Sequence, residues 1–151
     1  MLKIISLGNE LRGDDSIGPA VVNELRTMEL PEYVTLINAG ADAFTVLEHL
    51  IAKEPILIID CAQMGKSPGD VIKFRVDISN IKLFENSISL HGFSFGEVFK
   101  MAEEFGPIPD CSIIGVEPKS VEFGQKLSDE VKQSLPSIIN MVIEEAKQYG
   151  N

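Results

Sequence analysis

Apolar residues in this chain occur in short continuous runs, and between the runs apolar positions recur every three to four residues. The runs predict strands at 2–7, 34–37, 55–60, 69–76 and 111–117. The periodic stretches predict helices at 18–29, 43–53 and 93–105, and a last helix that begins at Ser128. This alternation of strands and helices predicts a three-layer α/β/α domain with a mostly parallel sheet.

The helical spacing also predicts which side chains face the sheet. The first helix is expected to bury Val21, Val22, Leu25 and Met28. The second helix is expected to bury Phe44, Val46, Leu47, Leu50 and Ile51. Pro136 lies inside the last helical stretch and predicts a kink or a split there, because proline lacks the N–H that a helix needs.

Two of the predicted strands differ in character. The run 55–60 is apolar almost throughout, which is typical of a central parallel strand covered on both faces. The run 69–76 alternates with a period of two and therefore predicts a half-exposed strand nearer an edge. The connection between them is too short for a crossover helix, so the second run is predicted to form an antiparallel hairpin with the first.

Composition limits the class of protein. With 151 residues, 44% of them hydrophobic and 24% charged, one globular domain over residues 1–151 is expected. The net charge of −10, without a cluster of Lys and Arg, argues against nucleic acid or an anionic membrane as partner. No apolar run approaches the ~20 residues of a membrane span, and the first run is unlike a signal peptide. We therefore expect a cytoplasmic protein with its two cysteines, Cys61 and Cys111, as free thiols.

The segment from Leu7 to Gly18 joins the first strand to the first helix and is rich in glycine and acid. Ligands of open α/β sheets bind beyond the carboxyl ends of the strands, which is where this segment lies. Its glycines do not follow the G-x-G-x-x-G pattern, and it lacks the Lys-Ser/Thr of a P-loop. Acids where a pyrophosphate would rest also disfavour dinucleotide binding.

Three side chains from separate loops are expected at this edge. Asp15 follows the first strand, Asp60 ends the third, and His91 precedes the third helix. Two carboxylates and one imidazole form a plausible site for nickel, zinc or manganese and disfavour copper(I) or an Fe–S cluster, which take thiolates. The alternative for each is a structural role: a cap or turn at Asp60 and at Asp15 with its neighbour Asp14, and a helix-start cap at His91.

Three further residues were considered for a role in the site. Cys61 follows Asp60 directly, and its alternative roles are a nucleophile, a soft metal ligand or a packed side chain. Packing is favoured because successive residues of a strand face opposite sides of the sheet. Glu117 ends the last strand at the same edge, where it either supports the metal ligands or forms a turn. His49 lies off the apolar stripe of its helix and is expected on the surface.

These segments together resemble the NiFe-hydrogenase maturation endopeptidases. The strongest element is Gly8-Asn9-x-Leu11-x-Gly13-Asp14-Asp15-x-x-Gly18 after an N-terminal strand. Residues 58–62 around Asp60 are similar to the family's second metal-binding segment, and residues 89–91, which end at His91, to its third. Segments 114–118 and 127–128 extend the resemblance over essentially the whole chain.

The resemblance implies an enzyme that removes a short C-terminal extension from the large-subunit precursor of a NiFe hydrogenase after nickel insertion. It implies Asp15, Asp60 and His91 as the metal-contacting and catalytic residues. The turn that supports them would comprise Gly8, Asn9, Gly13, Asp14 and Gly18. The metal would be nickel supplied by the precursor, although zinc or cadmium would fit the same ligands in a crystal.

The resemblance also implies a fold and a state of association. The expected fold is phosphorylase/hydrolase-like, with a mixed five-stranded sheet that contains one antiparallel strand. The free protein is expected to be a monomer.

One segment departs from the family pattern. Many relatives carry Asp-x-Gly-Thr after the second strand, a turn linked to substrate recognition. The corresponding residues here are Asn38, Ala39, Gly40 and Ala41, with neither the Asp nor the Thr. The departure leaves open which hydrogenase would be served.

The mechanism that we expect depends on an incomplete metal site. Three protein ligands leave coordination positions open, so that the thiolate-bound nickel of the precursor would complete the site and polarise the scissile carbonyl or a water. Asp14 is a candidate base, with fixing the turn as its alternative role. Two other functions would use the same residues: a non-catalytic nickel-binding assembly factor for hydrogenase maturation, and a different metal-dependent hydrolase.

Overall fold

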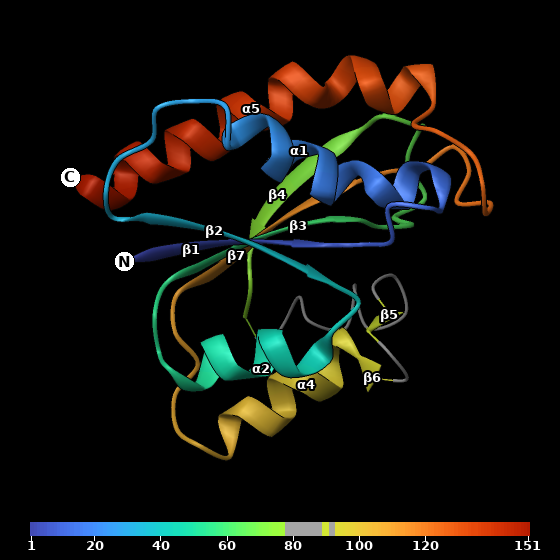
Figure 1. Ribbon diagram of the computed structural model, residues 1–151. Helices are drawn as coiled ribbons and strands as arrows, with labels where there is room; N and C mark the ends of the chain where they lie inside the picture. The colour runs from blue at the N-terminus through green and yellow to red at the C-terminus, as the bar shows by residue number, and fades with distance from the viewer. Residues whose placement is uncertain (78–88, 91–92) are drawn as a thin grey trace.

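A five-stranded sheet with helices on both faces forms the protein (Figure 1). The computed structural model describes residues 1–77, 89–90 and 93–151. The order of strands across the sheet is β2-β1-β3-β7-β4. In that order, their bounds are Val34–Gly40, Leu2–Leu7, Ile56–Cys61, Cys111–Val116 and Val71–Arg75. A separate antiparallel pair joins β5 (Ser89–Leu90) and β6 (Phe93–Ser94).

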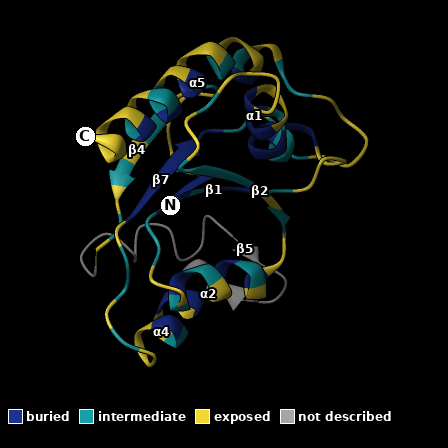
Figure 2. Ribbon diagram, turned by 60° about the vertical axis from the view of Figure 1, so that its left-hand side comes forward, coloured by how far each residue is buried: buried dark blue, intermediate teal, exposed yellow. Residues whose placement is uncertain are grey.

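The helices of the described residues form one layer on each face of the sheet. The layer on one side contains α1 (Ile17–Leu25) and α5 (Asp129–Gly150), and the other contains α2 (Ala43–Ile51) and α4 (Phe95–Glu103). Each layer encloses its own cluster of buried apolar side chains against the sheet. Figure 2 shows α5 with its buried residues toward the sheet and its exposed residues outward. The predicted three-layer α/β/α architecture is confirmed.

The directions of the strands decide where a site can form. Strands β2, β1, β3 and β7 are parallel, and β4 runs antiparallel to β7. The sheet is therefore mixed and mostly parallel, as the resemblance implied. All six residues of β3 and all six of β7 are buried, which agrees with central strands covered on both faces. The carboxyl ends of β1, β3 and β7 meet at one edge of the sheet.

The neighbour of β4 is not the one that the sequence suggested. We expected this strand to form a hairpin with β3, but it pairs with β7, which lies between them. The antiparallel direction and the partly exposed position at the edge are as predicted. Strand β7 is buried along its whole length, which favours a position with a strand on either side and separates β4 from β3.

Two predicted helix faces need correction. Helix α1 ends at Leu25, so the helical spacing no longer applies to Met28, which is 39% exposed rather than buried. Phe44, in the first turn of α2, is 67% exposed, because that helix presents Ala43, Val46 and Leu50 to the core instead. The other residues predicted to be buried in these helices are buried or half-buried.

The last helix is continuous through Pro136, which excludes the split that the sequence offered as the alternative to a kink. Proline removes one backbone hydrogen bond from the interior of a helix. Helix α5 compensates with a buried apolar stripe on the sheet, formed by Val131, Ile138, Ile139, Val142 and Ala146. In the described part of the chain, no helix has the length and apolar character needed to cross a membrane.

The first turn of α1 packs closely against the sheet, and this contact positions the segment that precedes the helix. A Cβ added at Gly18 would lie 2.5 Å from the carbonyl oxygen of Leu7 and 2.8 Å from that of Ile59. Only glycine permits this approach of helix to strands. The segment between Leu7 and Gly18 is thereby held over the ends of β1 and β3.

Candidate catalytic site

Asp15 and Asp60 interact where β1 and β3 end. Asp15 belongs to η1 (Gly13–Ser16), a 3-10 turn that follows β1 and packs against β3. Asp60 is the next-to-last residue of β3, and only 5% of it is exposed. Burial and, after it, the negative charge of Asp15 raise the pKa of Asp60, so the two carboxylates influence each other. The two acids predicted from the sequence therefore form one pair at the carboxyl edge of the sheet.

The environment of Asp60 suits a carboxylate that is neutralised by a cation. Burial is the main cause that raises the pKa of Asp60 well above its ordinary value, and the charge of Asp15 adds to it. The backbone N–H of Cys61 donates to Oδ1 of Asp60 over 2.7 Å, and this hydrogen bond lowers the pKa of Asp60. A positive ion beside such a buried carboxyl offsets the desolvation and favours the ionised form. The pair thus fits two oxygen ligands of a divalent metal.

The carboxylate of Asp15 is oriented by the glycine-rich turn. The backbone N–H of Asn9 donates to Oδ2 of Asp15 over 2.9 Å, and Oδ1 of Asn9 in turn accepts from the N–H of Leu11. Gly8 has a φ of 124°, and a Cβ there would lie 2.0 Å from the carbonyl oxygen of Asp15. A side chain at position 8 would therefore displace Asp15, which gives Gly8 and Asn9 a specific role in holding it.

His91, the third predicted ligand, lies outside the described residues. Within the described ranges, no three His, Cys, Asp or Glu side chains gather into a group that would hold a metal ion. The structure thus brings together Asp15 and Asp60, and the set of three with His91 stays a prediction.

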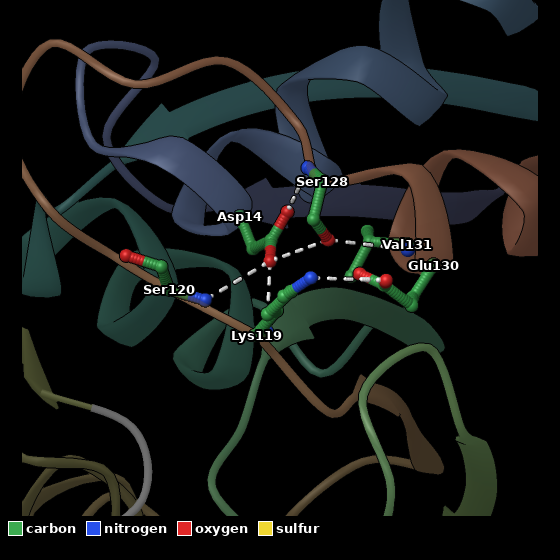
Figure 3. A network of polar contacts seen from close by, with 6 residues as sticks. All are labelled: Asp14, Lys119, Ser120, Ser128, Glu130 and Val131. Carbon is green, nitrogen blue, oxygen red and sulfur yellow. Dashed lines mark hydrogen bonds and ion pairs between the residues drawn. The ribbon is translucent and has the colours of Figure 1, made fainter.

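Asp14, the neighbour of Asp15, belongs to a hydrogen-bond network with the segment before α5 (Figure 3). It is 1% exposed, and its carboxylate accepts four hydrogen bonds from the segment before α5. The donors are the N–H of Lys119 at 2.8 Å, the N–H of Ser120 at 3.2 Å, and the N–H and hydroxyl of Ser128 at 2.7 and 2.8 Å. Both oxygens are engaged, so the structure favours the turn-fixing role of Asp14 over that of a base.

Gly13 permits the two segments to come this close. Its φ is 55°, and a Cβ there would lie 2.7 Å from the carbonyl oxygen of Ser120. The sequence did not show that the segment 119–128 returns to this turn, because nothing in either segment marks the other as its partner. The local signal at Ser128 predicted only the start of the last helix.

Comparison with known proteins identifies the family. The model of the HycI hydrogenase maturation protease family matches residues 19–145, more than half of the chain. The chain belongs to the hydrogenase maturation protease family. A putative hydrogenase maturation protease of Methanocaldococcus jannaschii is 36% identical, over 95% of this chain and 86% of the relative. The hydrogenase 2 maturation protease of Escherichia coli is 26% identical, over 97% and 91% respectively.

A solved structure supports the fold of this maturation protease. The hydrogenase maturating endopeptidase HybD of Escherichia coli has a TM-score of 0.83 to it, over 99% of this chain and 93% of that chain. The two sequences are 24% identical, so this similarity concerns the fold.

Glu117 shapes the loop that follows β3 in this maturation protease. Its side chain is buried, and Oε1 accepts the backbone N–H groups of Met64 and Lys66 over 2.8 and 2.9 Å. Its own backbone pairs with the segment that leads into β4, at Gly69 and Asp70. Of the two interpretations of Glu117, the structure therefore favours the turn residue, which fixes the loop beside Asp60.

Cys61 is a packed thiol. It is 7% exposed and belongs to the apolar cluster under α1 and α5. Burial, followed by the negative charges of Asp60 and Asp15, raises the pKa of Cys61 far above its ordinary value. Its place in this buried apolar cluster favours the packing interpretation of Cys61.

The departing turn at 38–41 lies beside the glycine-rich turn. Strand β2 extends further than predicted and includes Asn38, Ala39 and Gly40, while Ala41 follows it. The N–H of Gly8 donates to the carbonyl oxygen of Gly40 over 2.9 Å, and the Asn38 amide donates to the Glu10 carboxylate over 3.3 Å. Asn38 and Ala41 are exposed. This segment is therefore accessible at the edge of the sheet that carries Asp15.

Proposed function

We propose that this maturation protease removes the C-terminal extension of a NiFe-hydrogenase large-subunit precursor after nickel has entered the precursor. Membership of the family supports the peptidase activity. The observation that carries the assignment of the site is the pair of Asp15 and largely buried Asp60 at the carboxyl edge of the sheet. Ligands of this class of sheet bind at that edge.

Nickel enters the proposal as part of the substrate. Asp15 and Asp60, with His91, would supply two oxygens and one nitrogen and leave positions open for the ligands of the precursor. Once bound there, nickel would polarise the scissile carbonyl or a water. The raised pKa of Asp60 is consistent with this role, since a buried carboxyl of this kind gains from a positive neighbour.

The residues around the pair hold it in position for the reaction. The N–H of Asn9 orients Asp15, and the N–H of Cys61 orients Asp60. Asp14 and Glu117 fix the two loops on which these carboxylates depend. Such fixed positioning lowers the barrier of a hydrolysis, because the reacting groups need little rearrangement.

The test is intact-mass spectrometry of a nickel-loaded, C-terminally extended large subunit incubated with the protein. We expect the loss of one discrete C-terminal peptide with the wild-type protein. Asp60→Asn and His91→Ala should leave the precursor intact, as should omission of nickel. Asp129→Asn is the matched control, because Asp129 is an exposed acid in the first turn of α5, and it should cleave at the wild-type rate.

Two outcomes would replace the proposal. If the precursor kept its mass while the protein bound nickel through Asp15 and Asp60, the protein would be a nickel-binding assembly factor. If it held a metal tightly and hydrolysed a chromogenic ester or amide without any protein substrate, it would be a different metal-dependent hydrolase.

A further inference from the structure

Two segments far apart in the sequence form one surface beside the candidate site. We call residues 8–13 and 119–128 together the double loop. Besides the contacts of the Asp14 carboxylate, hydrogen bonds tie the first segment and the start of η1 to the second. They join Gly13 N–H to Gln125 O (3.0 Å), Asp14 N–H to Ser120 O (2.9 Å), Gly124 N–H to Leu11 O (2.7 Å) and Arg12 Nε to Val121 O (3.3 Å). The backbone of the double loop is therefore held from both sides.

This fixed backbone presents two large apolar side chains to solvent. Phe123 is 75% exposed, the highest value for a large apolar residue in the described ranges, and Leu11 is 61% exposed. The hydrogen bond between Leu11 O and Gly124 N–H places the two residues on adjacent stretches of backbone. Isolated exposed apolar residues are ordinary, but neighbouring ones on a rigid frame are typical of anchors in protein interfaces.

The double loop is continuous with the candidate site. The N–H of Leu11 donates to the Asn9 side chain, and the N–H of Asn9 donates to the carboxylate of Asp15. Asp60 is only 5% exposed, so an extended segment of polypeptide can approach it more readily than the body of a folded protein. A folded substrate that inserts its tail toward Asp60 must rest its body on the surrounding rim, and the double loop belongs to that rim.

We propose that Leu11 and Phe123 form the docking surface for the folded body of the hydrogenase precursor, an inference that rests on the proposed function. The partner would offer an apolar patch next to the attachment of its C-terminal extension. A second copy of this chain is a poorer occupant, because each copy carries a net charge of −10 and would cover the approach to Asp15.

The test compares Leu11→Ser and Phe123→Ser with Phe105→Ser. Phe105 is a matched control, since it is 61% exposed but follows α4 and precedes β7, at the opposite edge of the sheet. With nickel-loaded precursor as substrate, we expect Phe123→Ser to raise KM about tenfold and to leave kcat within about twofold. Leu11→Ser should act in the same direction, and Phe105→Ser should match the wild type. Thermal unfolding of all variants shows whether each is folded.

A binding measurement separates this inference from the proposed function. Calorimetry of the same variants with the precursor measures docking even if no cleavage occurs. An affinity about tenfold weaker for Phe123→Ser, but not for Phe105→Ser, supports the docking surface. Equal KM and equal affinity for Phe123→Ser and the wild type would overturn it while leaving the peptidase assignment intact. Sedimentation that shows a wild-type dimer and a Phe123→Ser monomer would overturn it in favour of self-association.

Discussion

Ser128 donates both its backbone N–H and its hydroxyl to the carboxylate of Asp14, although 114 positions separate the two residues in the sequence. The same hydroxyl oxygen accepts the N–H of Val131 and so caps α5 (Figure 3). One buried carboxylate thus connects the turn that carries Asp15 to the start of the last helix. The position of the candidate catalytic acid depends on that connection.

Asp14→Asn should lower stability and activity together. Asn supplies one oxygen where the carboxylate supplies two, so at least one buried donor loses its acceptor. The expected loss is about 1–3 kcal/mol in the free energy of unfolding, measured by urea denaturation. Cleavage of the precursor should fall more than tenfold, since the double loop and Asp15 lose their common anchor. Asp129→Asn is the control, and an Asp14→Asn protein with wild-type stability would contradict the structural role.

Asp60→Asn should abolish cleavage and yet stabilise the metal-free protein at neutral pH. The pKa of Asp60 is higher in the folded protein than its ordinary value, so the folded state binds this proton more tightly than the unfolded state. The resulting contribution to stability is fully present below about pH 4 and is lost as the pH rises through the folded pKa. Asn carries no charge and avoids that loss.

The measurement for Asp60→Asn is urea unfolding in the presence of a chelator at about pH 4 and about pH 7.5. The variant should gain on the order of 1 kcal/mol or more relative to the wild type between the two pH values. If the variant and the wild type differed in free energy of unfolding by the same amount at both pH values, the charge of Asp60 would not destabilise the folded protein. Asp129→Asn is again the control, because Asp129 is an exposed acid.

Gly8→Ala should disrupt the site, whereas Gly124→Ala should be tolerated better. Both glycines have positive φ, but a Cβ at Gly8 would lie 2.0 Å from the carbonyl oxygen of Asp15. In the described part of the chain, no atom outside residues 123–125 lies within 4 Å of a Cβ at Gly124. Gly124→Ala should cost about 1–2 kcal/mol for the backbone conformation alone. Gly8→Ala should cost more than this and should remove activity. Equal unfolding curves for the two variants would contradict the close contact.

Both cysteines should resist alkylation in the folded protein. Burial is the main cause that raises the pKa of Cys61 and of Cys111, and nearby carboxylates add to it. The thiolate is the reactive form, so iodoacetamide at about pH 8 should modify neither residue without denaturant and both in urea. Mass spectrometry over time gives the result. Rapid modification of Cys61 in the native protein would contradict its burial.

Local patterns in the sequence were sufficient for the layers of the fold. The apolar run at 55–60 marked a central strand, and the alternation at 69–76 marked an edge strand, because each pattern reflects how many faces of a strand are covered. Asp15 and Asp60 were recognisable as a pair for a related reason. Each follows or ends a strand, and parallel strands bring such positions to one edge of the sheet.

The tertiary structure alone decided which segments became neighbours. Strand β7 separates β4 from β3, and the segment 119–128 returns to Asp14, yet no residue in either case specifies a distant partner. The exposure of Phe44 and Phe123 was equally hidden, since an apolar side chain shows its preference for burial but not whether the fold has room to bury it. Chain direction, register and close packing settle those questions, because they depend on contacts between residues that are far apart in the sequence.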